Sequence, residues 1–212
     1  LVIAPFFPEY TVFIENAGAH AVILPPDTEH FQISLENLEK AITPHTRAII
    51  VNSPNNPAGT VYSADTYTKM AAILTKKSSE IGHAIYLISD EPYREIIYDG
   101  LPILYVPKFY ANTIVCYSYS KSLSLPGERI GYILVPDSVS DKDVYPAVCG
   151  AGRAMGFVCA PHLFQDVVLK CLGQTSDMNI YDENRKLLYN DLEEMGYDCV
   201  YPQGAFYLFV KS

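Results

Sequence analysis

Residues 118–131 read Ser-Tyr-Ser-Lys-Ser-Leu-Ser-Leu-Pro-Gly-Glu-Arg-Ile-Gly, and apolar, β-prone runs flank them at 113–117 and 130–135. A lysine at the mouth of a strand, such as Lys121, can lose part of its hydration, and a partly dehydrated amine is a nucleophile towards carbonyls. The hydroxyl of Ser118 and the guanidinium of Arg129 are suited to bind a phosphate. Together these groups favour a phosphate-bearing aldehyde as the ligand. The alternative is that the lysine and the arginine are ordinary solvated charges.

The composition is that of an acidic chain with enough apolar residues for a core. Of its 212 residues 49% are hydrophobic and 18% charged, which fits one large domain or one domain and part of another. The net charge of −9 argues against a nucleic-acid partner, because phosphate backbones require basic surfaces. No apolar run approaches the roughly 20 residues that cross a bilayer, so we expect no membrane partner.

Cysteines and histidines give two further expectations. The five cysteines show no C-x-x-C spacing, and we interpret them as reduced, mostly buried thiols of a cytoplasmic protein. The five histidines are scattered, so the sequence predicts no metal site. The chain lacks an initiator Met and stops just beyond a strand-like run, which we interpret as a piece of a longer protein.

Strand-like and helix-like segments alternate along the first two thirds of the chain. We predict strands at 1–4, 21–24, 48–51, 84–88, 113–117 and 130–135, with helices at 10–17, after Ser34, and from Ser63 to Gly82. Residues 96–104 suggest a small hairpin or an irregular excursion. From residue 141 we expect helices at 141–154, 161–172 and 177–195, followed by strands at 199–201 and 205–210. This alternation predicts an α/β fold with a mostly parallel sheet covered on both faces.

Polar side chains follow three successive strands of this predicted sheet. Asn56, Asp90 and Lys121 are each separated by about one strand–helix–strand unit of roughly 30 residues. Ligands of open α/β sheets bind at the carboxyl ends of the strands, so we expect these groups at one edge. A nearly dehydrated Asp90 needs a cationic partner, and a pyridinium N–H would serve. Tyr93 and the Asn56 amide are placed to bond a phenolic oxygen on the same ring.

These motifs carry a resemblance to a known family. Asn-Asn-Pro-Ala-Gly at 55–59, Asp-Glu-Pro-Tyr at 90–93 and Ser-Tyr-Ser-Lys at 118–121, with Arg129 eight residues on, resemble the fold-type I aminotransferases of the aspartate aminotransferase superfamily, classes I and II. The resemblance covers essentially the whole chain. It implies the large domain of the pyridoxal-phosphate transferase fold over residues 1–175, without its first strand, and the start of an α+β small domain over 176–212.

The resemblance also implies a role for each matching residue. Lys121 forms the Schiff base with pyridoxal 5'-phosphate and moves a proton, while Asp90 keeps the pyridine nitrogen protonated. Tyr93 completes the predicted catalytic group. The implied cofactor-binding residues are Lys121, Asp90, Tyr93, Asn56, Ser118, Arg129 and Phe7. The last of these, Phe7, matches the position of a ring that stacks on the cofactor.

Plainer roles remain open for some of these residues. Phe7 can be a core residue, Asn56 a turn residue and Tyr93 a packing residue, and we interpret Ser120 and Ser124 as structural. The chain also departs from the family pattern. Ala58 replaces the usual threonine, and we expect the glycine-rich phosphate loop, a tyrosine from the neighbouring subunit and the small-domain arginine that binds the substrate carboxylate to lie outside the chain.

The function implied for the whole protein is a pyridoxal-phosphate aminotransferase. It is expected to exchange the amino group between an L-amino acid and a 2-oxo acid, with aspartate and 2-oxoglutarate as our first choice of substrates, and to work as a cytoplasmic homodimer. Two alternatives remain open. One is a lyase or decarboxylase on the same fold, and the other is the aminotransferase-like sensor domain of a transcription regulator.

Overall fold

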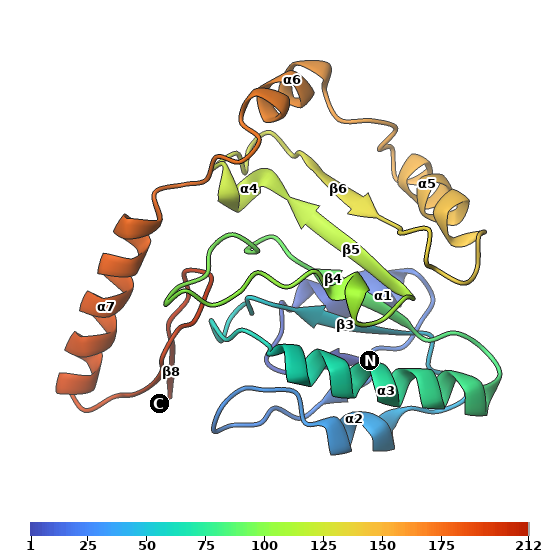
Figure 1. The fold of residues 1–212 in the computed structure, drawn as a ribbon, viewed down its shortest axis with the longest axis horizontal. Coiled ribbons are helices and arrows are strands. Elements are labelled where there is room, and N and C mark those ends of the chain that lie inside the picture. Colours follow the sequence, from blue (N-terminus) through green and yellow to red (C-terminus); the bar gives the residue numbers. More distant parts are fainter. Residues whose placement is uncertain (212) are drawn as a thin grey trace.

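The computed structural model describes residues 1–211, and Ser212, the last residue of the predicted segment 176–212, lies outside the described residues. In this part of the chain six strands form one sheet, in the order β2-β1-β3-β4-β5-β6 (Figure 1). The strands are β1 Val2–Ile3, β2 Ile23–Leu24, β3 Ala48–Asn52, β4 Tyr86–Asp90, β5 Thr113–Ser118 and β6 Gly131–Leu134. Neighbouring strands are parallel except for β5 and β6, which are antiparallel. The predicted α/β fold with a mostly parallel sheet is therefore confirmed.

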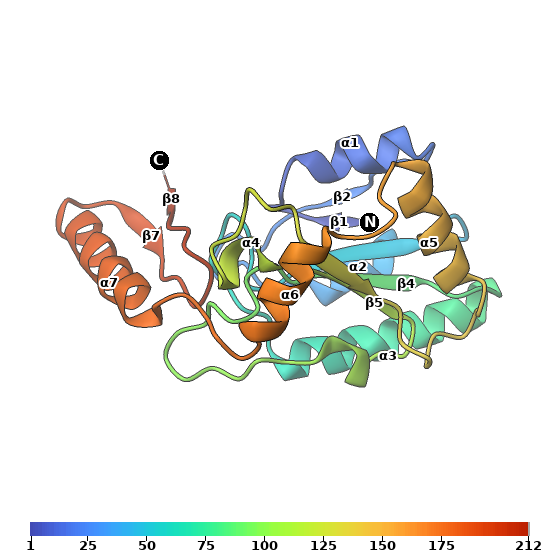
Figure 2. The same ribbon diagram turned by 90° about the horizontal axis from the view of Figure 1, so that it is seen from above.

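Helices cover both faces of the central strands. Figure 2 shows α1 on one side of the sheet and α3 on the other. The bounds of these helices and of their neighbour are α1 Glu9–Asn16, α2 Leu35–Ala41 and α3 Ala64–Ile81. Alternate strand residues such as Ile49, Val51 and Leu87 are almost fully buried in one cluster with Met70 and Leu74 of α3. This cluster is the main core. It packs against the central strands and so supports the edge of the sheet at which their carboxyl ends lie.

The two predicted helix caps are confirmed. The hydroxyl of Ser63 accepts a hydrogen bond from the Thr66 amide at 3.0 Å, and Ser34 begins α2 in the same way. Gly82 ends α3 in the left-handed region, with φ of 80°, a conformation that costs glycine little because it has no Cβ.

The last third of the chain forms a separate layer and a small α/β unit. Its elements are α5 Val144–Ala154, α6 His162–Lys170, α7 Met178–Glu194, β7 Asp198–Val200 and β8 Phe209–Lys211. Strands β7 and β8 pair in an antiparallel two-stranded sheet, and α7 packs against β7. Figure 1 shows α7 and β8 beyond the ends toward which β3 and β5 point, while α5 lies on the opposite side of the picture. Among residues 1–211, no helix is both long enough and apolar enough to cross a membrane.

Two segments differ from a regular strand or hairpin. Residues 96–104 follow the irregular alternative, with a single bridge between Ile97 and Gly204. The predicted strand at 205–210 is wrong over residues 205–208, since β8 begins at Phe209. The reason is that the amide of Ala205 bonds to the carbonyl of Ile96 at 2.8 Å, instead of to β7.

The expectation of mostly buried cysteines is also wrong. Of the five free cysteines only Cys199 is buried, while Cys149 and Cys159 are exposed and the remaining two, Cys116 and Cys171, are partly buried. The exposed pair belongs to α5 and the connection to α6, where α5 buries none of its residues within the described chain.

Candidate active site

A cavity of about 660 Å³ opens at the carboxyl ends of β3, β4 and β5. Its volume lies in the range of roughly 300–1,000 Å³ that is typical of small-molecule sites. All of the residues predicted for the site line this cavity, and they come from five separate segments of the chain: Phe7, Asn56, Asp90, Tyr93, Ser118, Lys121 and Arg129. The parallel strands bring the residues that follow them to one edge, and the segment before α1 adds the aromatic side chain.

Asp90 is the last residue of β4, and its carboxylate is held by a partner that the sequence did not reveal. The Tyr10 hydroxyl, from the first turn of α1, donates a hydrogen bond to this carboxylate. Burial raises the pKa of Asp90, while the hydrogen bond from Tyr10 opposes that rise. Within residues 1–211 Asp90 forms no ion pair. A partly buried carboxylate that faces a cavity in this way favours a cationic group on a bound ligand.

Tyr10 was missed because its contact spans 80 residues of sequence. The one local signal is the three-residue spacing from Phe7, which places both aromatic rings together. Their centroids are 5.8 Å apart and the rings meet edge to face. Tyr10 is 8% exposed, and it lines the cavity together with Phe7, which precedes α1, and Phe13 of the same helix.

Lys121 lies on a short helix, α4 Tyr119–Ser122, directly after β5. The Ser118 hydroxyl starts this helix by accepting a hydrogen bond from the Ser120 amide at 3.0 Å. The Lys121 Nζ atom is 5.2 Å from the ring centroid of Phe206 and 5.9 Å from that of Tyr93. In the described chain Lys121 forms no ion pair, so its amine is available to the cavity.

Ser118 and Arg129 both line the cavity, and so does Ser120, which we interpreted from the sequence as structural. The hydroxyl of Ser118 donates to that of Ser120 at 2.6 Å, and Ser120 itself lines the cavity. Arg129 is exposed and donates from Nη1 to the carbonyl of Pro126 at 2.8 Å. Two hydroxyls and an arginine with remaining free donors form a site suited to an anion.

Asn52, at the end of β3, holds two of the predicted residues in place. Its side-chain amide donates to the Asp90 carbonyl at 2.9 Å, and its side-chain oxygen accepts from the Asn56 amide at 2.6 Å. Asn52 is 4% exposed and satisfies both partners within the protein. The predicted strand at 48–51 left Asn52 outside the sheet, and only the pairing of β3 with β4 reveals this role.

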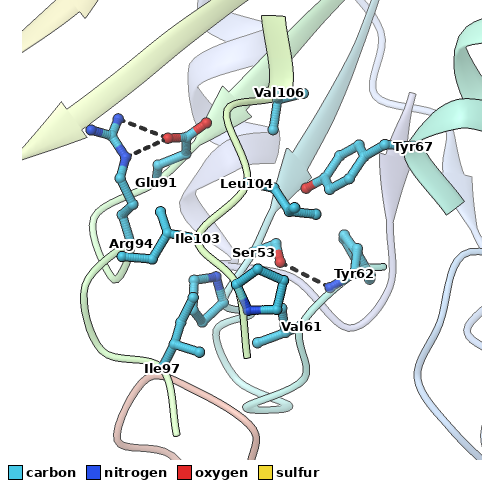
Figure 3. A pocket seen from close by; sticks show the side chains of 12 residues that line it. Ser53, Val61, Tyr62, Tyr67, Glu91, Arg94, Ile97, Ile103, Leu104 and Val106 are labelled. Atoms are coloured by element: carbon cyan, nitrogen blue, oxygen red, sulfur yellow. Dashed lines mark hydrogen bonds and ion pairs between the residues drawn. The ribbon is translucent and has the colours of Figure 1, made fainter. Parts of the chain in front are cut away.

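Tyr93 is presented by a turn that a buried ion pair anchors. Figure 3 shows the Arg94 guanidinium bonded to the carboxylate of Glu91, with both nitrogen–oxygen distances at 2.7 Å. Glu91 is 2% exposed and also accepts from the Ser89 hydroxyl at 2.7 Å. These bonds fix the ends of the turn, beside a cavity of only about 20 Å³, which has room for a single water molecule. The ring of Tyr93 is therefore directed to the larger cavity.

Tyr93 is itself 4% exposed, and burial raises the pKa of its phenol. A hydrogen bond from the side chain of Asn56 opposes this rise. The Tyr93 hydroxyl also lies 2.5 Å from that of Tyr207, which comes from the segment before β8 and lines the same cavity. Tyr207 was not identified from the sequence.

The chain matches known proteins along its whole length. Residues 1–211 match the family described as aminotransferase class I and II. The chain is 32% identical to aromatic-amino-acid aminotransferase 2 of Thermococcus litoralis and 29% identical to an aspartate aminotransferase of Geobacillus stearothermophilus, in each case over 100% of this chain and 54% of the relative.

Solved structures share the fold. A crystal structure of an aminotransferase from Eubacterium rectale superposes with a TM-score of 0.97 at 62% identity, over 100% of this chain and 53% of that one. An aspartate aminotransferase of Thermus thermophilus, a tetra mutant, superposes with a TM-score of 0.86 at 28% identity, over 99% of this chain and 57% of that one. The chain thus spans about half the length of the relatives that it matches. It belongs to the class I and II aminotransferase family.

Proposed function

We propose that the full-length protein is a pyridoxal-phosphate-dependent aminotransferase, which exchanges the amino group between an L-amino acid and a 2-oxo acid. The observation that carries this proposal is the pairing of Asp90 and Lys121 across one cavity. Asp90 is a partly buried carboxylate that faces the cavity, and Lys121 supplies an amine to the same space. An acid that attracts a cation and a lysine that attacks a carbonyl are both needed to hold a pyridine aldehyde.

The residues present fit this cofactor. Ser118, Ser120 and Arg129 offer donors for its phosphate, and Phe7 offers a ring for one of its faces. Tyr93 and Asn56, which lie together, offer donors for its phenolic oxygen. When bound, the cofactor supplies a ring that withdraws electrons from the α-carbon of the substrate.

The protein residues then divide the remaining work. The carboxylate of Asp90 keeps a proton on the ring nitrogen, and Tyr10 holds that carboxylate in place. The amine of Lys121 takes a proton from the α-carbon of the substrate and returns one on the cofactor side. The aromatic rings of Tyr93 and Phe206 lie beside this amine, with centroids 5.9 and 5.2 Å from its Nζ atom.

For the substrates we propose aspartate and 2-oxoglutarate. In favour of a dicarboxylic substrate, several relatives are named aspartate aminotransferases, among them those of Geobacillus stearothermophilus and Pyrococcus abyssi. The relative from Thermococcus litoralis is named an aromatic-amino-acid aminotransferase, so aromatic donors belong in the same assay. Release of carbon dioxide or of an eliminated group, without a new amino acid, would indicate the lyase or decarboxylase alternative.

We also propose that the protein is a cytoplasmic homodimer, with a large domain over 1–175 and the start of a small domain over 176–212. Exposed apolar side chains on and around α5 and α6 support a subunit contact there: Tyr145, Met155, Phe157, Val158, Leu163 and Leu169. The five free thiols are typical of a reducing compartment. Sedimentation of an active monomer would contradict the dimer.

The experiment that tests the function compares the full-length protein with its Lys121→Ala variant. Wild type is expected to bind pyridoxal phosphate with a visible absorbance band and to form a new amino acid from a 2-oxo acid. The variant is expected to fold but to lose the exchange, because no other described side chain in the cavity carries an amine. Substantial turnover by the variant would refute the assignment.

A further inference from the structure

Two tyrosine hydroxyls meet in the wall of the active-site cavity. The Oη atoms of Tyr93 and Tyr207 are 2.5 Å apart, and the rings pack edge to face with centroids 5.5 Å apart. Tyr93 belongs to the turn after β4, and Tyr207 to the segment before β8, 114 residues later. Both side chains line the cavity that contains Lys121.

The backbone before Tyr207 is attached to the loop after β3 and to the segment after β4. The amides of Gln203 and Gly204 both donate to the carbonyl of Gly59, at 2.8 and 2.9 Å. The amide of Ala205 donates to the carbonyl of Ile96 at 2.8 Å. The loop and the segment that hold this backbone are the ones that carry two of the proposed cofactor-binding residues.

Close packing leaves this backbone no other position. A Cβ added at Gly204 would lie 2.8 Å from the carbonyl oxygen of Ile96, so only glycine fits. The next residue, Ala205, is fully buried. The hydroxyl of Tyr207 is therefore held against that of Tyr93 by the fold, and not by the hydrogen bond alone.

The number of hydroxyl protons in the pair determines which tyrosine can donate to a ligand. A phenol carries one proton and also accepts hydrogen bonds, so the pair uses one proton internally and keeps the other. If Tyr93 donated to Tyr207, no Tyr93 proton would remain for a ligand. Donation from Tyr207 to Tyr93 is the arrangement that leaves the Tyr93 proton free for a ligand in the cavity that Tyr93 and Asn56 both line.

We propose that Tyr207 is a positioning residue for Tyr93: its hydroxyl donates to the Tyr93 oxygen and thereby directs the Tyr93 proton to the phenolic oxygen of bound pyridoxal phosphate. The inference rests on the proposed function, since it takes that oxygen as the ligand of Tyr93. Hydrogen bonds in a chain polarise one another by about 10–30%, so the donor behind Tyr93 also strengthens the bond that Tyr93 makes.

The test is a pH titration of the visible absorbance of the full-length, cofactor-loaded protein. A hydrogen bond to the phenolic oxygen withdraws electron density from the bound cofactor, so the cofactor loses its titrating proton at a lower pH. Removing the hydrogen-bond donor therefore raises the midpoint pH of the absorbance titration. Tyr93→Phe is expected to raise the midpoint most. Tyr207→Phe keeps the ring and its packing, and is expected to raise the midpoint by about 0.2–0.6 pH unit.

A second background separates positioning from a structural effect. In protein that already carries Tyr93→Phe, adding Tyr207→Phe is expected to leave the midpoint unchanged, because the Tyr93 hydroxyl through which Tyr207 acts is absent. Tyr197→Phe is the matched control, since Tyr197 is 49% exposed on the same small unit. Its midpoint is expected to equal that of wild type.

Two results would overturn the inference and leave the proposed function intact. One is that the Tyr207→Phe variant has the same titration midpoint as wild type although the Tyr93→Phe variant has a shifted midpoint. The other is an equal effect of Tyr207→Phe with and without Tyr93. A wild-type protein that shows no visible band with pyridoxal phosphate would instead refute the proposed function, and the inference with it.

Discussion

Replacing Tyr10 by phenylalanine tests how the protein keeps the Asp90 carboxylate ionised before any ligand binds. The change removes one hydroxyl and retains the ring that packs edge to face on Phe7. Within residues 1–211, Tyr10 is the only side chain that donates to the Asp90 carboxylate. The variant therefore leaves a partly buried carboxylate without its donor and changes little else.

The magnitude follows from the direction of the pKa shift of Asp90. Burial raises this pKa above its usual value, so the folded protein holds the proton more tightly than the unfolded chain. Stability then falls as the pH rises from the unfolded pKa of about 3.9 through the folded pKa. Loss of the Tyr10 hydroxyl raises the folded pKa further and deepens the fall. A hydrogen bond contributes about 1.5–3 kcal/mol to a charged group and about 0.5–1.5 kcal/mol to a neutral one. The Tyr10→Phe penalty should thus be about 1 kcal/mol larger at pH 8 than at pH 4.

The assay is urea unfolding of the full-length apoprotein at pH 4, 6 and 8. Wild type and Tyr10→Phe are compared alone and in the Asp90→Asn background, where the pH dependence of the Tyr10→Phe penalty is expected to vanish. Tyr197→Phe serves as a control, since Tyr197 is 49% exposed and lies outside the proposed subunit contact, and its change should stay within about 0.5 kcal/mol of wild type. A Tyr10→Phe penalty that is equal at pH 4 and pH 8 would refute the reasoning.

Three other substitutions test separate parts of the structure. Asp90→Asn should retain cofactor binding in the full-length protein but lower the exchange rate by several powers of ten, as measured with a coupled transaminase assay; a near-native rate would reduce Asp90 to a strand-end residue. Gly131→Ala places a Cβ 2.3 Å from the carbonyl oxygen of Tyr117, so the free energy of unfolding in urea should fall by about 1–3 kcal/mol. An unchanged unfolding midpoint would contradict this close contact. Arg185→Met removes a buried guanidinium that makes two hydrogen bonds to Asp99, at 2.8 and 2.9 Å, and should lower the free energy of unfolding by about 1.5–3 kcal/mol. Hydrogen exchange should increase most in α7, and an increase confined to other elements would argue against this role.

Much of the fold could be predicted because its signals are local. A hydroxyl that caps a helix, as Ser63 does for α3, acts on an amide three residues away. Apolar runs of strand length between helices predict parallel strands, and parallel strands bring the residues that follow them to one edge. Asn56, Asp90 and Lys121 line one cavity for that reason.

The irregular segments could not be predicted, because their hydrogen-bond partners are remote. Residues 205–208 have the apolar character of a strand, yet the amide of Ala205 bonds to Ile96 and not to β7. In the same way Tyr98 donates its hydroxyl to the carbonyl of Ala205 at 2.6 Å, which holds residues 96–104 away from a hairpin. A strand pattern describes what a segment can pair with, and the packed fold decides with which segment it pairs.

By itself the sequence determined the α/β fold, the order of its strands and helices, and the side chains that meet at the edge of the sheet. Only the tertiary structure decided which groups surround those side chains. Tyr10 reaches Asp90 across 80 residues, and Tyr207 reaches Tyr93 across 114. The physical reason is that a hydrogen bond forms only within about 3 Å and with defined angles. No local periodicity encodes such a contact, because it depends on where packing places two distant pieces of backbone.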